Sequence, residues 1–171
     1  KNANILKFLG GSIKGELVTC IFEYFPDMAP LSNRIKDISD SPKTLTIIAY
    51  QIAEGFRFLH SNNIIHGSLN LQSILFRLPS QGIYTYIWNF GLSNRVGVDY
   101  KILPPEFYKE GDFNPELGSN DGIYTFETDV YPYGLLLYHI GKLEELYSNV
   151  SLDKIKEIIC DPNNRPSFDG K

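Results

Sequence analysis

The side chains best placed to do chemistry lie in two short segments. The first, Ile65–Leu75, carries a histidine, two serines, an asparagine and a glutamine among apolar residues, and the second, Trp88–Leu92, places Asn89 before a Phe-Gly pair. Neither segment contains a carboxylate. A neutral hydroxyl cannot act as a base near pH 7, and an amide oxygen lacks the negative charge that hard cations such as Mg²⁺ prefer. The side chains of these two segments are therefore poorly suited to acid–base catalysis and to metal binding.

Taken one at a time, these residues have ordinary explanations. A histidine such as His66 in an apolar stretch is more often a core residue than a catalyst. Ser68 and Ser73 are typical loop hydroxyls, and Asn89-Phe90-Gly91 is typical of a turn. The surrounding elements must decide between these interpretations.

The strongest of those elements is a helix. From Pro42 to about Asn62, apolar residues recur at spacings of three and four, which predicts one buried stripe. Strand-like runs at 74–76 and 83–88 then bracket a Pro-Ser-Gln-Gly turn and predict a hairpin that holds the two polar segments side by side. The remaining predicted elements are strands at 5–9, ending in a turn at Gly10-Gly11, and at 17–24, a short helix at 31–38, mostly loop at 94–124, and helices at 127–140 and after Ser151.

Composition narrows the function classes. A chain of 171 residues with 43% hydrophobic content can bury one core, and its net charge of −4 argues against a nucleic-acid or anionic-lipid partner. Cys20 and Cys160 form no C-x-x-C pattern, which predicts a reducing, cytoplasmic setting. The three histidines show no metal-ligand spacing. No apolar run approaches the roughly 18 residues of a membrane span.

Six motifs, in order between Asn4 and Phe168, resemble those of a protein kinase. They are Phe22–Phe25 at the gatekeeper and hinge, His66–Leu75 at H-R-D-L-x-x-x-N, Asn89-Phe90-Gly91 at D-F-G, Pro104-Pro105-Glu106 at A-P-E, Asp129–Gly134 at D-V-W-S-F-G, and Asp161–Pro166 at D-P-x-x-R-P. Within the protein kinase superfamily, the motifs are most similar to those of tyrosine-kinase-like members. The resemblance implies an α+β kinase-like fold. Residues 1–27 would be a remnant of the small lobe, with two strands and the hinge, and 28–171 the helical large (C-terminal) lobe.

The same resemblance implies that the catalytic set is degenerate. In kinases an aspartate accepts the hydroxyl proton, and an aspartate and an asparagine hold two Mg²⁺ ions. Ser68 stands at the proton acceptor, Asn70 at the residue that steadies the phosphate, and Ser73 and Asn89 at the metal ligands. No catalytic residue is intact, and neither metal position carries a convincing ligand. Losing a positioned base alone costs about 10²–10⁴-fold in rate.

Nucleotide binding is also weakly supported. The sequence contains neither G-x-G-x-x-G nor V-A-I-K, which would cradle the phosphates. It leaves open whether this chain is a fragment of a longer protein or the gene has lost that half. If a nucleotide binds, Glu23, Phe25 and Leu75 would form its adenine pocket. We expect no cofactor, with ATP and magnesium bound weakly at most.

The structural positions of the family are kept. By resemblance, Asp129 would hydrogen-bond the backbone of the catalytic loop. Glu106 and Arg165 would form a buried ion pair, whose breakage typically costs about 3–5 kcal/mol.

A stack of side chains is implied as well. His66 and Phe90 would pack as the lower part of the regulatory spine, with Phe8 above them. The scaffold would therefore hold its loops in shape without using them.

These observations predict a catalytically inactive pseudokinase that acts as a signalling scaffold or an allosteric binding module. Its expected partners are other signalling proteins, an active kinase among them. Two alternatives stay open. One is an active ATP-dependent protein kinase that uses atypical residues for Ser/Thr or Tyr phosphotransfer. The other is a truncated, non-functional kinase fragment that does not fold alone.

Overall fold

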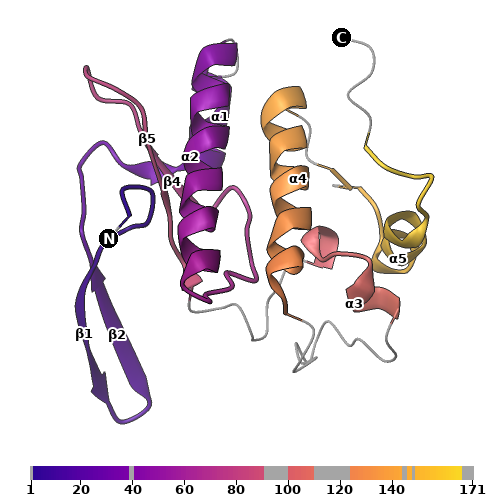
Figure 1. Cartoon of the computed structure of the whole chain (residues 1–171), viewed down its shortest axis with the longest axis horizontal. Helices are drawn as coiled ribbons and strands as arrows, with labels where there is room; N and C mark the ends of the chain where they lie inside the picture. The colour runs from indigo at the N-terminus through magenta and orange to yellow at the C-terminus, as the bar shows by residue number, and fades with distance from the viewer. Residues whose placement is uncertain are drawn as a thin grey trace.

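The computed structural model describes residues 2–38, 41–90, 100–109, 124–143, 146–147 and 149–166. A two-stranded antiparallel sheet comes first along the chain, a three-stranded antiparallel sheet has strands before and after the longest helix, and helices dominate the rest (Figure 1). The elements are β1 (Phe8–Lys14), β2 (Leu17–Phe22), β3 (Ala29–Pro30), η1 (Leu31–Asn33), α1 (Ile35–Ile38), α2 (Pro42–Ser61), β4 (Ile74–Arg77), β5 (Tyr84–Ile87), η3 (Tyr100–Ile102), α3 (Glu106–Lys109), α4 (Phe126–Lys142) and α5 (Leu152–Cys160). The predicted α+β class is confirmed.

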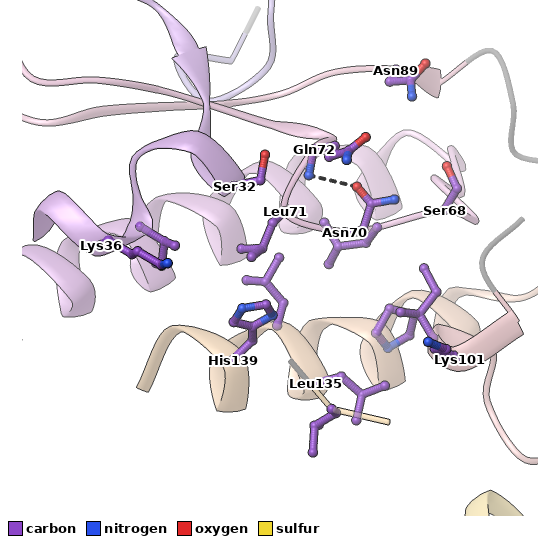
Figure 2. A pocket seen from close by; sticks show the side chains of 16 residues that line it. Ser32, Lys36, Ser68, Asn70, Leu71, Gln72, Asn89, Lys101, Leu135 and His139 are labelled. Carbon is purple, nitrogen blue, oxygen red and sulfur yellow. Dashed lines mark hydrogen bonds between the residues drawn. The ribbon is translucent and has the colours of Figure 1, made fainter. Parts of the chain in front are cut away.

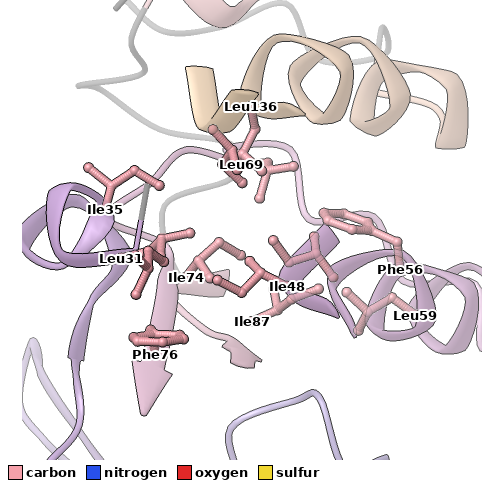
Figure 3. Packing of buried hydrophobic residues seen from close by; sticks show 13 residues of the cluster. Leu31, Ile35, Ile48, Phe56, Leu59, Leu69, Ile74, Phe76, Ile87 and Leu136 are labelled. Carbon is pink, nitrogen blue, oxygen red and sulfur yellow. The ribbon is translucent and has the colours of Figure 1, made fainter. Parts of the chain in front are cut away.

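Helix α2 forms where the apolar spacing predicted it. Ser41 caps its start, because the Ser41 hydroxyl accepts a hydrogen bond from the Thr44 N–H, and Pro42 occupies the first turn, where its missing N–H costs nothing. The helix buries a stripe of side chains against β5 and α4 (Figure 3). That stripe is Ile48, Ile52, Gly55, Phe56 and Leu59.

The main core lies between α2, β4, β5 and α4. Figure 3 shows Ile48 of α2 close to Ile74 and Ile87 of the sheet, with Leu136 of α4 beside Leu69 of the loop that precedes β4. Each of these five side chains is at most 4% exposed. A smaller second core joins α3 to α5 through Phe107, Tyr108, Ile155 and Ile159 with Leu103.

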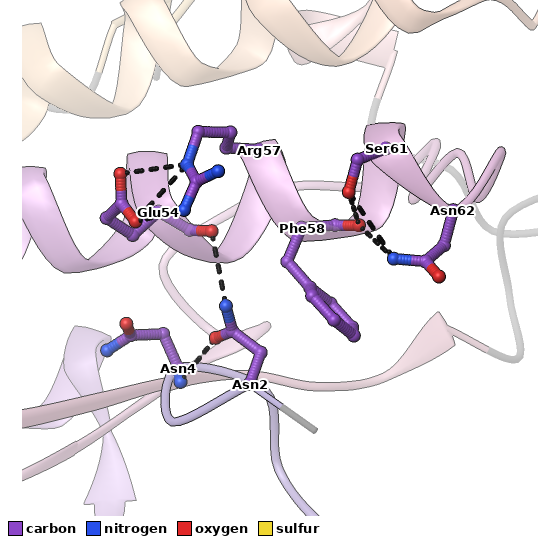
Figure 4. Close-up of polar contacts among 7 residues, drawn as sticks. All are labelled: Asn2, Asn4, Glu54, Arg57, Phe58, Ser61 and Asn62. Carbon is purple, nitrogen blue, oxygen red and sulfur yellow. Dashed lines mark hydrogen bonds and ion pairs between the residues drawn. The ribbon is translucent and has the colours of Figure 1, made fainter.

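Three strands support the polar loops. Strand β4 lies between β3 and β5, and both neighbours run antiparallel to it. The N-terminal segment adds a single parallel bridge between Ile5 and Ile87. It is also tied to α2, since the side-chain amide of Asn2 donates to the carbonyl of Glu54 (Figure 4). The Asn2 Oδ1 accepts from the N–H of Asn4, which holds the Asn2 side chain in place.

The first hairpin differs from its prediction. The predicted turn at Gly10-Gly11 is wrong, because β1 runs through both glycines and pairs with β2 from Phe8 to Lys14. A register shift lies between Phe8 and Gly10, and the chain reverses at Gly15, which has φ of +61°. A glycine pair can therefore mark an irregular strand instead of a turn.

Helix α4 begins after Thr125, where the Thr128 hydroxyl accepts a hydrogen bond from the Thr125 N–H and donates to the Thr125 carbonyl. It extends beyond the predicted 127–140 at both ends and packs beside α2 (Figure 1). Within the described part of the chain, no helix is both long and apolar enough to cross a membrane.

Candidate functional site

The loop between α2 and β4 is anchored by one buried carboxylate. Asp129 of α4, 1% exposed, accepts hydrogen bonds from the N–H of His66 at 2.9 Å and of Gly67 at 2.7 Å. The imidazole of His60 lies 2.9 Å from the same carboxylate. Hydrogen bonds to a charged acceptor are shorter and stronger than neutral ones. Three partners thus offset the cost of burying the charge and fix the start of the loop.

His66 serves this architecture through both ring nitrogens. Its Nδ1 accepts from the N–H of Ser68 at 3.3 Å, so the proton sits on Nε2, which donates to the carbonyl of Trp88 at 2.9 Å. The ring packs against Phe90, with centroids 5.0 Å apart, and against Phe56 at 6.0 Å. Burial lowers the pKa of His66, although the Trp88 carbonyl and the Asp129 charge act in the opposite direction. His66 is therefore a neutral packing residue.

Asn70 and Ser73 are engaged with each other. The Ser73 hydroxyl accepts from the Asn70 N–H and donates to the Asn70 carbonyl, both at 2.9 Å. The Asn70 Oδ1 accepts from the N–H groups of Gln72 and Ser73, also at 2.9 Å. Ser73 is completely buried. The two side chains thus close the turn, and the oxygens that a metal would need are already used.

Ser68 and Asn89 are the other two predicted positions. The Ser68 hydroxyl is buried and makes no hydrogen bond to the described residues, a situation that typically costs about 1–3 kcal/mol. Asn89 has φ of +68°, a left-handed conformation that asparagine tolerates better than most residues. Gly91, which completes the D-F-G-like motif, lies outside the described residues.

These residues share one cavity of about 580 Å³. Ser68, Asn70 and Asn89 line it together with parts of α1, η3 and α4 (Figure 2). The complete lining is Ser32, Ile35, Lys36, Ser68, Leu69, Asn70, Leu71, Gln72, Asn89, Lys101, Ile102, Pro132, Leu135, Leu136, His139 and Leu146. Ser73 is absent from this lining because it is buried inside the turn.

The three predicted adenine-contacting residues are only partly brought together. Leu75, 6% exposed, packs in a cluster with Leu6 and Tyr86 that Phe25 and Trp88 help to cover.

The Phe25 ring stacks on Tyr86 at 6.1 Å, and the Arg77 guanidinium lies 3.8 Å from the centroid of the same ring. Glu23 faces another residue, since its carboxylate accepts from the N–H of Lys7 at 3.1 Å.

Two structural expectations are wrong. Among the described residues, Glu106 and Arg165 form no ion pair. The Arg165 guanidinium instead donates to the carbonyls of Ile159 and Asp161, at the end of α5, where free carbonyls attract a cation. Phe8 does not continue the His66–Phe90 stack, because it lies on the first hairpin, 57% exposed and edge-on to Phe22.

Comparison with known proteins settles the lineage. The family described as protein tyrosine and serine/threonine kinase matches residues 1–169. The chain belongs to this protein kinase family. It is 34% identical to the mast/stem cell growth factor receptor Kit of Takifugu rubripes over 62% of this chain and 11% of the receptor, and 36% identical to kita of Danio rerio over 58% of this chain and 10% of that relative.

Another relative of this kinase domain is a probable inactive serine/threonine-protein kinase of Dictyostelium discoideum, 28% identical over 87% of this chain and 14% of the relative. The domain spans only about a tenth of the length of the relatives it matches.

Sequence reasoning missed several residues of this kinase-family site. His60, the third partner of Asp129, shows only as a histidine in the last turn of a helix. Lys36, Lys101 and His139 line the cavity from three separate segments, and no local pattern joins them.

Proposed function

We propose that this domain is a pseudokinase, which does not transfer phosphate and works by binding other proteins as a scaffold or allosteric partner. The observation that carries the proposal is the set of side chains at the four catalytic positions. Ser68 and Asn89 stand where the family uses aspartates to accept a proton and to hold Mg²⁺. Ser73 stands at the metal-binding asparagine, and Asn70 at the residue that steadies the phosphate. Among the described residues that line the shared cavity, none carries a carboxylate side chain.

The local geometry supports the same proposal. Ser73 and Asn70 satisfy each other, so a metal would have to compete with four hydrogen bonds of the turn. In the hinge region, Leu75 is covered by aromatic side chains of the chain itself. Both arrangements disfavour the binding of Mg·ATP, and both are compatible with a stable fold.

The wider assignment follows from these points. Its partners would be signalling proteins, an active kinase among them, because a folded kinase-like domain that does not transfer phosphate can still bind other proteins through its surface. We place it in the cytoplasm, and the two free thiols of Cys20 and Cys160 suit a reducing compartment. The name of the Dictyostelium relative, a probable inactive kinase, supports loss of activity within the family.

Two measurements test the proposal on the whole chain. The first is a thermal melt with and without millimolar Mg·ATP, since a ligand that binds only the folded state raises the midpoint. The second is transfer of labelled phosphate to a generic Ser/Thr/Tyr peptide mixture. We expect a cooperative melt that ATP does not shift, and no transfer. A magnesium-dependent shift accompanied by transfer would establish the alternative of an active, atypical kinase.

Variants sharpen the result. The double variant Ser68→Asp, Asn89→Asp restores two family carboxylates, and Asn63→Asp is the matched control, because Asn63 also has a left-handed backbone but lies outside the cavity. If the parent chain already transferred phosphate and the double variant transferred it at the same rate, the residue types at positions 68 and 89 would not limit activity and the proposal would fail.

A further inference from the structure

The direction in which the β1–β2 hairpin projects is fixed at its base. Figure 1 shows its far end extending beyond the helices, and Ile13 and Leu17 beside its turn are 77% and 66% exposed. Side chains this exposed pack against few neighbours. The direction of the hairpin therefore depends on the two segments that connect it to the three-stranded sheet.

The two connections are built differently. On the N-terminal side a main-chain hydrogen bond continues the sheet, because the Leu6 N–H donates to the Ile87 carbonyl at 3.0 Å. On the other side residues 23–28, the joining segment, lead from β2 to β3 through a tight turn. The Met28 N–H closes this turn by donating to the Phe25 carbonyl at 3.0 Å. The turn then contacts the sheet through its side chains.

Arg77, at the end of β4, contacts this turn at two points. Its Nε donates to the Asp27 Oδ1 at 2.8 Å, and its guanidinium carbon lies 3.8 Å from the centre of the Phe25 ring. The ring of Tyr84 lies 5.7 Å from the same carbon. Phe25 in turn stacks on Tyr86 of β5, with ring centres 6.1 Å apart and planes inclined by 14°. One arginine thus holds both a charged and an aromatic residue of the turn against the sheet.

Partial burial strengthens these contacts. The Arg77 side chain is 16% exposed and the Asp27 side chain 39%. A cation that is largely withdrawn from water is attracted to an aromatic face more strongly than an exposed one, and salt screens its ion pair less. Arginine suits this position better than lysine, because its planar group can stack on a ring and donate hydrogen bonds in its own plane.

We propose that Arg77 is a latch that fixes the direction of the β1–β2 hairpin. In the closed form Arg77 holds Asp27 and Phe25, as the structure shows. In the open form both contacts are released, Phe25 leaves the sheet, and the hairpin turns about the intact connection between Leu6 and Ile87. A partner that binds the open form more tightly shifts the population toward it. The latch does not depend on phosphate transfer, so it goes beyond the proposed function and is tested separately from it.

The distance between two spin labels tests the latch in the whole chain. One label is placed on the exposed thiol of Cys20 in β2 and the other on Ser61→Cys at the exposed end of α2, with Cys160→Ser to prevent labelling elsewhere. The labelled chain with Arg77 should give one narrow distance distribution, because a minor form typically holds less than about 10% of the molecules. Arg77→Ala should add a second component that raises the open population about threefold or more. An unchanged distribution in Arg77→Ala, or a broad one already in the chain with Arg77, would overturn the inference.

Further variants separate the two contacts. Arg77→Lys keeps a charge opposite Asp27 but loses the planar stack on Phe25, and it should give an intermediate open population. Asp27→Asn removes only the charge partner at an exposed position, so it serves as the test if Arg77→Ala fails to fold, and it should change the distribution in the same direction. Arg34→Ala, which removes an arginine from the ion pair with Asp37, is the matched control and should change nothing. Equal broadening in this control would contradict a specific role of Arg77.

Amide hydrogen exchange distinguishes a turning hairpin from an unfolded one. In Arg77→Ala the amides of Leu6 and Ile87 should stay as protected as in the parent chain. The amide of Met28, which closes the turn, should exchange about tenfold faster or more, because the turn is released from the sheet. Loss of protection at all three amides would mean that the base of the hairpin unfolds, and no pivot would then exist for a latch to control.

Discussion

The Asp129 carboxylate lies 2.7 Å from the backbone nitrogen of Gly67, across the boundary between α4 and the degenerate catalytic loop. The same side chain holds the N–H of His66 and approaches His60, so three segments meet at one buried charge. The loop is thus shaped by a residue that performs no chemistry. The backbone at the start of the loop is therefore held independently of the side chains of Ser68 and Asn89.

Asp129→Ala should be strongly destabilising. The variant leaves two buried N–H groups without an acceptor and removes the partner of His60, and breaking a buried charged network typically costs about 3–5 kcal/mol. Asp129→Asn, which keeps one acceptor oxygen, should cost less. Urea unfolding measures both changes in the free energy of unfolding. Asp37→Asn, at an exposed ion pair, is the control and should change stability by less than about 0.5 kcal/mol. Equal stability of all three variants would contradict this account.

The buried ring of His66 makes stability depend on pH. Because burial lowers its pKa in the folded state below the ordinary 6.5, the unfolded chain binds the proton more readily between the two values. The free energy of unfolding should therefore have its full contribution from neutral His66 above pH 6.5. This contribution should decline as the pH falls toward the folded-state pKa. One proton limits the slope to about 1.4 kcal/mol per pH unit.

The check is urea unfolding at a series of pH values between about 5 and 7.5, above the range in which carboxylates titrate. His66→Phe keeps an aromatic ring beside Phe90 and should flatten the decline. The control His139→Gln removes a histidine from the cavity wall and should leave the decline in stability unchanged. A decline that persisted unchanged in His66→Phe would assign the pH dependence to another group.

Two helical glycines should respond to alanine with opposite signs. A Cβ on Gly55 of α2 would lie 2.6 Å from the Cδ1 of Ile87 and 3.3 Å from the Asn4 carbonyl, and Ile87 is fully buried. Overpacking of this kind typically costs about 1–3 kcal/mol. A Cβ on Gly134 of α4 would meet nothing within 4 Å.

Gly134→Ala should therefore stabilise the chain by up to about 1 kcal/mol through helix propensity, while Gly55→Ala should destabilise it. Thermal or urea unfolding of the two variants provides the comparison, with each serving as the control for the other. If both substitutions were stabilising, the packing of α2 on β5 would be looser than the structure describes.

The sequence predicted those parts of this domain whose structure follows from a local sequence pattern. Helix α2 ends within a residue of its predicted limit because apolar periodicity and a cap agree. Strand β1 was misplaced because a glycine pair has no single meaning until its partner strand is known. The cavity was beyond prediction, since Lys36, Lys101 and His139 meet only through tertiary packing. Arg165 was assigned a partner by analogy, and nearby carbonyls bound it instead.

Returning Ser73 to the asparagine of active kinases should damage the loop. Ser73 is fully buried and makes both of its hydroxyl hydrogen bonds to the Asn70 backbone. Ser73→Ala should cost about 1–3 kcal/mol through those lost bonds. Ser73→Asn should cost more, because it loses the same bonds and adds volume to a closed turn. Ser61→Asn, at the exposed end of α2, is the matched control and should be nearly neutral. Urea unfolding gives this ranking, and a stable Ser73→Asn variant that gained Mg·ATP binding would show instead that the turn still accommodates the metal ligand of an active kinase.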